Sequence, residues 1–362
     1  MHSGYLRFSL LIGVLAFQGV DTVGAQEFQP DYSLGADFLY RVDFITAENK
    51  DPRNRQQFQI HVRLNAELQD NLTLGFQLRS GDTDPVSAKQ AFTGGFSAKP
   101  VEIDLAFINW RPLKGLQVNS GKMKNPFYSP LGNKLMWDVE LRPEGVSVTY
   151  SKPLGDMDMV LNASHLWILE RTSDKDAALA GGQARLQYHS RPAQVLLGIG
   201  YFNYRNTKGF QPIYDSTDGA GNSLDAAGNY RYDFDDVELI SEITVPNLFM
   251  PVTAYVDYIR NIAEGVDLKR AWIVGSALGN CVDPGDIAFY YSYRLIEKDS
   301  MIGAFNDSCF LGGGTDGKGH EFNFEYQASR KVRTYFTWFI SEKGVKNGTG
   351  YNRMQFDFNY TY

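Results

Sequence analysis

A short region of the sequence places charged side chains of opposite sign close together. They are Lys122, Lys124, Lys134, Asp138, Glu140, Arg142 and Glu144. If both signs faced a narrow aqueous opening, they would create a transverse electric field that orients dipolar molecules and biases the movement of ions. The alternative is that most of them pair with neighbouring parts of the chain and hold the region in place. The sequence leaves both roles open.

The same region, residues 124–144, has the composition of a loop that folds back against the protein. Pro126, Pro130 and Pro143 restrict its backbone. Its apolar side chains would be poorly placed in water. They are Phe127, Tyr128, Leu131, Leu135, Met136 and Trp137. We therefore expect loop 124–144 to fold inward.

Other residues that could do chemistry do not form a recognisable site. The histidines beyond the N-terminal segment are His61, His165, His189 and His320, and no Gly-x-Ser-x-Gly element lies beside them. A Ser/His pair could still meet across strands, so a hydrolase remains an alternative. The stretch 215–236 lacks the spacing of a calcium loop, and Gly312–Gly314 lacks a strand-to-helix context for phosphate. We expect no catalytic residue, metal, cofactor or nucleic-acid partner.

The composition limits the class of protein. The 362 residues are 43% hydrophobic and 21% charged, with a net charge of −7, two Cys and a mean hydropathy of −0.32. These values exclude a disordered chain, a collagen and a disulfide-stapled miniprotein. The longest apolar run, Leu10–Phe17, is too short to span a membrane as a helix. The aromatic content of 14% indicates that aromatic surface is used in bulk.

The first 25 residues have the pattern of a secretory signal peptide. Arg7 lies in a positively charged start, an apolar stretch follows, and small residues end the segment at Ala25. We expect cleavage after Ala25. Residues 26–362 would then form a single exported domain.

Past this segment, apolar and polar residues alternate with a period of two along nearly the whole chain, and no window shows sustained helical spacing. In the last dozen residues, Met354, Phe356 and Phe358 lie on one phase and Arg353, Gln355 and Asp357 on the other. Because side chains alternate across a strand, one face is aromatic and the other is polar. The pattern predicts sixteen strands, at 33–44, 55–69, 72–80, 101–111, 115–123, 145–152, 157–168, 182–189, 193–204, 235–245, 251–261, 270–278, 286–297, 320–328, 331–341 and 351–362.

Short and long connections alternate between these strands. The longest loops are 81–100, 124–144, 169–181, 205–234 and 298–319. A soluble β-sandwich also alternates, but short periplasmic turns and long outer loops are typical of an outer-membrane barrel. A closed barrel leaves no unpaired strand edge in lipid. The sequence therefore predicts an all-β transmembrane antiparallel barrel of 16 strands with loop 124–144 folded into the lumen. A phase slip near Phe107 predicts a β-bulge.

Charged residues on the polar phase are expected to line the lumen. The lining residues are Arg41, Arg63, Glu67, Arg79, Asp104, Arg185, Glu321, Glu325, Arg333, Arg353 and Asp357. The same phase includes Asp37, Asp43, Glu102, Asp158, Glu238, Glu242, Asp257 and Arg294, which makes twelve acidic residues against seven basic ones. This excess predicts a slight preference for cations, although the narrowest ring outweighs the average of the wall.

The aromatic residues Phe358, Tyr360 and Tyr362 end the chain on the lipid-facing phase. We expect this strand to be the signal that the outer-membrane assembly machinery recognises. Cys281 lies on a predicted periplasmic turn and Cys309 in an outer loop. A disulfide needs Cα atoms within roughly 7 Å, so we predict two unpaired thiols unless loop 298–319 folds deeply inward.

Two long segments resemble the putative porin family of Gram-negative outer membranes. They read GKMKNPFYSPLGNKLMWDVELRPEG at 121–145 and EKDSMIGAFNDSCFLGGGTDGKGH at 297–320, with support from RNRQQF at 53–58, LTLGFQLRSGDTDP at 72–85 and INWRPLKGL at 108–116. Cys309 departs from the acidic or polar residue expected at its position. The resemblance implies a sixteen-stranded channel in the lipid of the bacterial outer membrane, a homotrimer, that passes small hydrophilic solutes. An adhesin or structural anchor, with which loop 205–234 is compatible, remains an alternative.

Overall fold

The computed structural model describes residues 31–362 except 82, 191 and 247. The predicted signal peptide, residues 1–25, lies outside the described residues. Two short 3-10 turns, η1 (Pro130–Gly132) and η2 (Gly303–Phe305), interrupt an otherwise all-β structure. No helix among these residues is long and apolar enough to cross a membrane.

Seventeen strands form within the described residues, and one of them, β4 (Gln90–Ala91), has only two residues. The other sixteen build the barrel. They are β1 (Asp31–Ala47), β2 (Arg53–Gln69), β3 (Leu72–Ser80), β5 (Val101–Leu113), β6 (Leu116–Lys122), β7 (Glu144–Leu154), β8 (Met157–Leu169), β9 (Ala177–His189), β10 (Gln194–Arg205), β11 (Phe234–Val245), β12 (Val252–Asn261), β13 (Arg270–Gly279), β14 (Ile287–Ile296), β15 (Gly317–Ser329), β16 (Val332–Lys343) and β17 (Thr349–Thr361).

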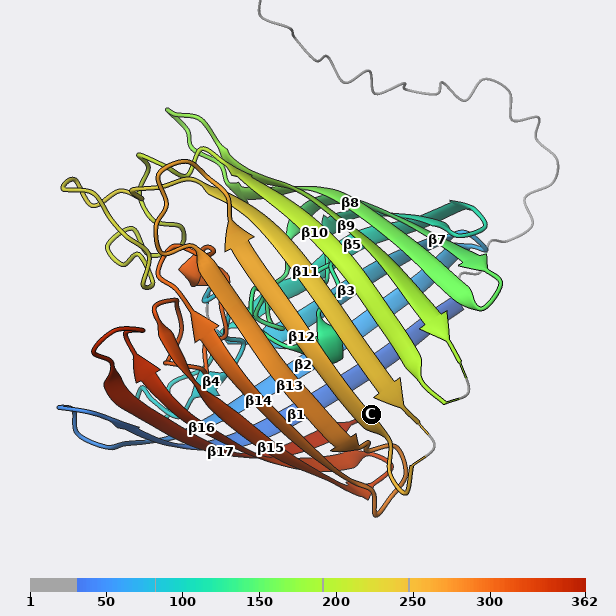
Figure 1. The fold of residues 1–362 in the computed structure, drawn as a ribbon. Helices are drawn as coiled ribbons and strands as arrows, with labels where there is room; N and C mark the ends of the chain where they lie inside the picture. The colour runs from blue at the N-terminus through green and yellow to red at the C-terminus, as the bar shows by residue number, and fades with distance from the viewer. Residues whose placement is uncertain (1–30, 82, 191, 247) are drawn as a thin grey trace, which may run out of the picture.

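The strands form one closed antiparallel sheet. Each long strand pairs with its neighbours in sequence, and β1 closes the ring by pairing with both β2 and β17 (Figure 1). Tyr40 lies opposite Phe58 on β2 and Phe358 on β17. The prediction of a sixteen-stranded antiparallel barrel is confirmed.

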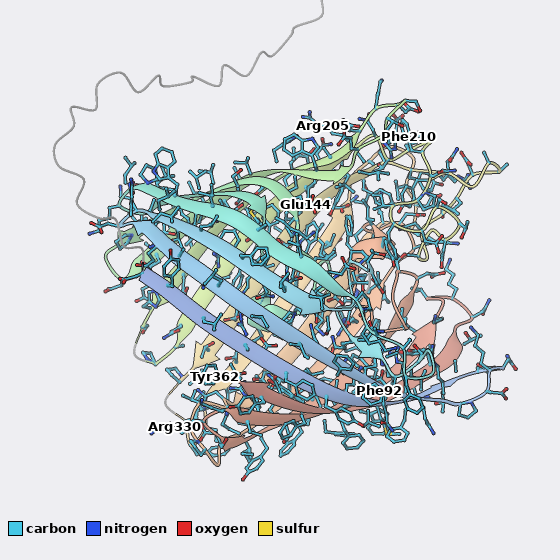
Figure 2. The ribbon with its side chains drawn as sticks, turned by 180° about the vertical axis from the view of Figure 1, so that it is seen from behind. Phe92, Glu144, Arg205, Phe210, Arg330 and Tyr362 are labelled. Atoms are coloured by element: carbon cyan, nitrogen blue, oxygen red, sulfur yellow. The ribbon has the colours of Figure 1, made fainter. Side chains whose placement is uncertain are left out.

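The two ends of the barrel differ in their connections. One end has tight turns such as 70–71, 155–156 and 330–331, whereas the other carries loops 81–100, 123–143, 206–233 and 297–316. Figure 2 shows Arg330 and Tyr362 at the short-turn end and Phe92, Arg205 and Phe210 at the long-loop end. The alternation of short and long connections therefore agrees with the sequence prediction.

On β17 the apolar side chains are exposed and the polar ones are buried, which is the opposite of a sheet in a water-soluble protein. Met354 and Phe356 keep 39% and 49% of their surface exposed, while Arg353 and Gln355 keep 4% and 2%. Apolar side chains therefore point outward and polar ones inward, as expected for a wall that faces lipid outside and water or polar groups inside.

Two local features differ from the prediction. The bulge lies at Asp104, where Gln77 pairs with Leu105 and Leu78 with Ile103, rather than near Phe107. Strand β9 begins at Ala177, so the loop before it is shorter than the expected 169–181. Near the start of β9, Gly181 has no room for a side chain because loop 123–143 packs closely against it. A Cβ on Gly181 would lie 2.7 Å from the ring of Phe127.

A hydrophobic core fills part of the interior. Loop 123–143 contributes Phe127, Leu135 and Trp137, loop 206–233 contributes Tyr230, and loop 297–316 contributes Met301, Ile302 and Phe310. Strand residues including Phe202 and Ile259 complete this cluster. Three long loops therefore share one core with the wall.

Candidate functional site

The first half of loop 123–143 is bound to the inner face of β9 and β11. The backbone N–H of Tyr128 donates to the side-chain oxygen of Gln183, and the side-chain amide of Gln183 donates to the backbone carbonyl of Tyr128. Both hydrogen bonds are 2.9 Å long. The hydroxyl of Tyr128 and the backbone N–H of Leu131 donate to the Glu242 carboxylate at 2.9 and 3.0 Å. Arg185 lies over the Tyr128 ring at 4.4 Å. Each of these wall side chains belongs to the polar phase of its strand.

The middle of the loop reaches β12 and the aromatic core. Asn133 donates to the Asp257 carboxylate at 3.0 Å, and its own side-chain oxygen accepts the N–H of Leu135 at 2.9 Å. Trp137 packs edge-on against Phe202, with ring centroids 5.6 Å apart. This segment is therefore fixed by both a buried amide and buried aromatic rings.

The second half of the loop is held by ion pairs. Glu140 accepts hydrogen bonds from Lys89 at 3.0 Å and from Gln59 at 3.1 Å. Arg142 binds Asp104, at the bulge of β5, at 2.9 Å. Burial opposes the charge of Glu140, but Lys89 and Arg142 outweigh it and hold the pKa of this carboxyl below its usual range.

Loop 297–316 is joined to loop 123–143 by several hydrogen bonds. The N–H of Asp138 donates to the Phe305 carbonyl at 2.9 Å, and the Asp138 carboxylate accepts the N–H of Ser308 at 3.0 Å. The side chain of Asn306 donates to the Leu135 carbonyl at 2.6 Å. Burial raises the pKa of Asp138, and the neighbouring Asp307 carboxylate adds to this effect. The two loops therefore form one connected unit.

Asp307 links this unit to the wall. It accepts a hydrogen bond from Arg294 at 3.0 Å and lies 3.9 Å from the Lys134 ammonium group. Arg294 also pairs with Glu321. Burial opposes the charge of Asp307, but Lys134 and Arg294 outweigh it and lower its pKa to about 2. Burial likewise disfavours the charge on Lys134, yet Asp307 and nearby acidic groups raise its pKa above the usual value.

The role of loop 297–316 was missed by the sequence reasoning, which placed it among the outer loops. Cys309, the residue that departed from expectation, lies 3.5 Å from both Arg41 and Gln355 of the wall. The apolar run around it was the available signal, since Met301 and Phe310 would be poorly placed in water. Both cysteines are free and buried, so the prediction of two unpaired thiols is confirmed.

Most of the predicted lining residues form ion pairs with one another or with neighbours on the wall. The pairs are Arg41 with Asp357, Arg63 with Asp37, Arg79 with Asp104, Arg333 with Glu325 and Arg353 with Asp43. Arg185 stacks on Tyr128, and Glu67 is exposed near the short-turn end. Most arginines among these lining residues are thus paired with a carboxylate on a neighbouring strand.

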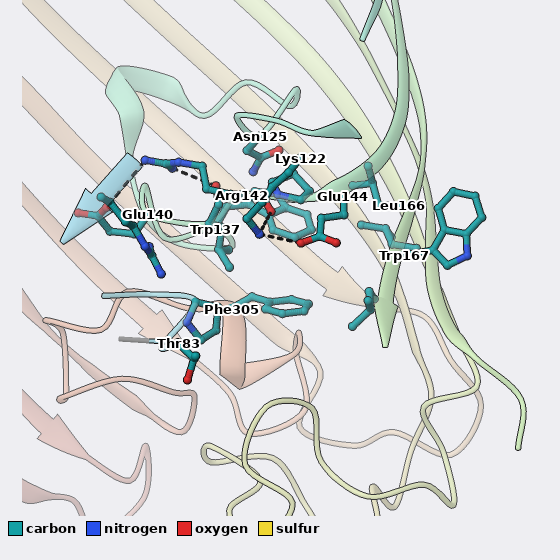
Figure 3. A pocket seen from close by; sticks show the side chains of 16 residues that line it. Thr83, Lys122, Asn125, Trp137, Glu140, Arg142, Glu144, Leu166, Trp167 and Phe305 are labelled. Atoms are coloured by element: carbon teal, nitrogen blue, oxygen red, sulfur yellow. Dashed lines mark hydrogen bonds and ion pairs between the residues drawn. The ribbon is translucent and has the colours of Figure 1, made fainter. Parts of the chain in front are cut away.

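Two cavities flank loop 123–143. The main cavity, about 340 Å³, lies between loop residues 131–134 and the inner faces of β1 and β12–β17. Of the seven charged residues between 122 and 144, Lys134 lines this cavity. Lys122, Glu140, Arg142 and Glu144 line a second cavity beside Trp137 and Phe305 (Figure 3). Lys122 pairs with Glu144 at 2.7 Å, and Lys124 is exposed.

The sequence matches the putative porin family over residues 39–234 and 221–362. The chain belongs to this family. Together with the barrel, this membership makes the protein an outer-membrane porin channel. No curated protein matches the sequence.

Solved porin structures share the fold at low sequence identity. OprB of Pseudomonas putida at high pH has a TM-score of 0.60 and 12% identity over 91% of this chain and 94% of that one. OmpF of Salmonella typhi in complex with daunomycin has a TM-score of 0.57 and 12% identity over 91% and 97%. The trimer form of OmpT, an outer membrane protein of Vibrio cholerae, has a TM-score of 0.53 and 13% identity over 91% and 99%.

Three of the four histidines in the part of the chain that the structure describes contact side chains on neighbouring strands of this porin. His61 bonds to Asp37, His189 bonds to Asp158, and His320 contacts Tyr291. Within the described residues, no group of His, Cys, Asp and Glu is arranged to hold a metal ion. Family membership and fold point to a channel rather than an enzyme.

Proposed function

We propose that this porin passes small hydrophilic solutes and ions by passive diffusion through a water-filled lumen. The main cavity carries the proposal. Its wall comprises polar and tyrosine side chains of β12–β17, including Tyr290, Asn323 and Thr337. A barrel of sixteen strands is too wide for its own side chains to fill, so water occupies what the loops leave open.

In this proposal, loop 123–143 forms the constriction. The support is its chain of contacts with Gln183, Glu242 and Asp257 on one side and with Asp104 on the other. These contacts confine the passage to the side of β12–β17. Most charges of the loop are paired, so they pin it. Lys134, which pairs with Asp307, also lines the main cavity together with Glu321 and Asp357. Opposed charges there would orient dipolar solutes.

The cellular setting is part of the same proposal. An N-terminal signal peptide cleaved after Ala25 delivers the chain to the periplasm, and the assembly machinery recognises Phe358, Tyr360 and Tyr362. The outward exposure of Phe358 and Tyr360, 44% and 38%, supports this role. The trimer form of OmpT supports a homotrimer here. Chemical cross-linking in outer membranes, read as monomer, dimer or trimer bands, tests the assembly.

Planar bilayer recording tests the proposed function. The purified protein should insert in discrete conductance steps, and the current should fall as the hydrated size of the ion increases. A barrel that serves only as an anchor or adhesin would give no steps. Heat-modifiable migration on gels should confirm in parallel that the inserted protein is a folded barrel.

A further inference from the structure

Two arginines lie directly opposite each other on the outer surface of the barrel. Strands β12 and β13 are antiparallel neighbours (Figure 1), and Arg260 pairs in register with Arg270. Along both strands buried and exposed residues alternate, and the two arginines fall on the outward phase. Val256 and Val274 share this phase and keep 47% and 42% of their surface exposed. Both guanidinium groups therefore leave the side of the wall that faces lipid.

The protein compensates little of this positive charge. Like charges directly opposite on neighbouring strands repel each other. The guanidinium of Arg260 has no hydrogen-bond or ion-pair partner among the described residues, and neither Glu264 nor Asp267 of the connecting loop pairs with either arginine. Arg270 reaches Glu297 at 3.5 Å, but this carboxylate also accepts the backbone N–H of Arg270 at 2.8 Å. The Arg270 side chain remains 61% exposed, so both cations are open to an external anion.

The pair of arginines lies near one edge of the membrane. Loop 262–269, which follows Arg260, is at the same end of the barrel as loops 206–233 and 297–316 because the strands are antiparallel. At the opposite end of this hairpin, Val252 pairs with Leu278 on the same outward phase, eight residues from each arginine. With a rise of about 3.4 Å per residue and a tilt of about 40°, this separation is about 21 Å along the membrane normal. The apolar band of such a barrel is about 25 Å tall, so the arginines lie at its outer edge.

Aromatic and apolar side chains flank the two arginines. Toward the middle of the membrane, Tyr258 lies opposite Trp272, and the rings of Trp272 and Tyr293 have centroids 5.5 Å apart. Toward the loop, Ile262 and Leu268 keep 53% and 38% of their surface exposed. Tyr and Trp are enriched at the membrane–water interface, where the lipid headgroups lie. The arginines therefore face the headgroups of the outer leaflet.

We propose that Arg260 and Arg270 together bind the phosphate of an outer-leaflet lipid, whose acyl chains lie against the apolar surface of β12 and β13. The planar guanidinium group forms paired hydrogen bonds with phosphate and is only weakly hydrated. One phosphate between the two arginines would offset their repulsion. The apolar surface below them fixes the direction of the chains. This site is on the outside of the barrel and does not require the lumen to conduct.

Native mass spectrometry of the purified protein in a neutral detergent, titrated with dimyristoyl phosphatidic acid, tests this proposal. The first phosphatidic acid should bind at least about tenfold more tightly than dimyristoyl phosphatidylcholine, which has the same chains but no net charge. Inorganic phosphate at the same concentration should not bind, because it lacks the chains. Equal binding of the two lipids, or binding of inorganic phosphate as tight as that of phosphatidic acid, would overturn the proposal. The readout is a bound mass, so the result is independent of conductance.

Three variants locate the binding. Arg260→Gln and Arg270→Gln should each weaken phosphatidic acid binding about tenfold, the value of one hydrogen bond to a charged group, and leave phosphatidylcholine binding unchanged. Arg205→Gln is the matched control, because Arg205 is an exposed arginine at the long-loop end (Figure 2) that lies opposite Ala178 rather than another cation. Unchanged binding in the folded Arg260→Gln and Arg270→Gln variants, or an equal loss in Arg205→Gln, would contradict the assignment.

A contact between copies of the chain is the competing explanation for the two arginines. In lipid-free detergent, Arg260→Gln should melt no lower than the native protein, because it removes a repulsive pair, and it should give the same cross-linked bands. Adding phosphatidic acid should raise the melting temperature of the native protein more than that of the variant. If Arg260→Gln instead loses oligomer bands and keeps its lipid binding, the arginines bind a second copy and the proposal is wrong.

Discussion

The side-chain amide of Asn306 donates a hydrogen bond to the backbone carbonyl of Leu135 at 2.6 Å, and both residues are buried. These residues are 171 positions apart and belong to the two loops that share the interior core. The loop expected to narrow the channel is therefore supported by a second loop rather than by the wall alone.

Replacing Asn306 should loosen both loops. Asn306→Ala leaves the Leu135 carbonyl buried without this donor, which costs about 1–3 kcal/mol. We expect a loss of stability of that size in urea unfolding followed by tryptophan fluorescence, and more open-channel current noise. Asn65→Ala is the control, since Asn65 is exposed and makes only a long contact of 3.4 Å. Equal behaviour of the two variants would mean that the bond between the loops contributes little.

Replacing aspartate by asparagine should change the stability of the barrel in opposite directions at two buried positions of the inner wall. Asp236 is fully buried, and neither carboxylate oxygen has a hydrogen-bond partner among the described residues. Asp236→Asn should therefore stabilise the barrel by about 1 kcal/mol or more, because a neutral amide costs less to bury. Asp357→Asn breaks a buried pair with Arg41 and should cost roughly 3–5 kcal/mol. Urea unfolding measures both, and a destabilised Asp236→Asn would show that its carboxylate has an unrecognised partner.

The depressed pKa of Asp307 predicts a window of acid sensitivity. The group has a pKa of about 2 in the folded protein and about 3.9 when unfolded. Its contribution, about 3 kcal/mol, is present above pH 4 or so and is lost as the pH falls toward 2. The stability difference between the native protein and Asp307→Asn should thus be constant near neutral pH and shrink below about pH 4. A difference that does not change with pH would contradict the ion pairs with Lys134 and Arg294.

Lys134 should bias ion selectivity. A unit charge roughly 8 Å from a passing ion in water contributes about 0.5 kcal/mol, or about a twofold change. Because removing the charge favours K⁺ and disfavours Cl⁻ by about this amount each, Lys134→Gln should raise the K⁺ to Cl⁻ permeability ratio about fivefold, measured as the reversal potential in a KCl gradient. Lys208→Gln, on an exposed outer loop, should leave the ratio unchanged. A clear anion preference of the native channel would contradict the cation preference that the excess of acidic residues on the polar phase predicts.

The barrel was predictable because most strands show the same alternation of apolar and polar residues. On β17, the alternation of Phe356 and Phe358 with Gln355 and Asp357 predicts a strand. It also predicts that one face of this strand is in an apolar environment and the other in a polar one. The start of β9 was missed since Ala177–Gly181 shows no alternation of apolar and polar residues, and at Gly181 the ring of Phe127 leaves no room for a side chain. The bulge lies at Asp104 and not near Phe107, because its position depends on how β5 pairs with β3. The sequence of β5 alone does not determine that pairing.

The site was less predictable than the fold. The prolines and apolar residues of loop 124–144 were enough to predict that it folds inward. Its charged residues could be identified from the sequence, but their partners could not. Which partner each charge takes depends on residues far away in sequence, such as Lys89 for Glu140 and Asp307 for Lys134. The inward position of loop 297–316 follows from the same kind of distant contact, between Asn306 and Leu135.

Single-channel recording of a loop deletion tests the central proposal most directly. Removing 134–141 should increase conductance and weaken the discrimination between small and large ions, while removing 225–228, an exposed turn of loop 206–233, should leave both unchanged. Both variants must first show heat-modifiable migration as folded barrels. If the folded 134–141 deletion conducts and selects ions as the native protein does, loop 123–143 does not form the constriction.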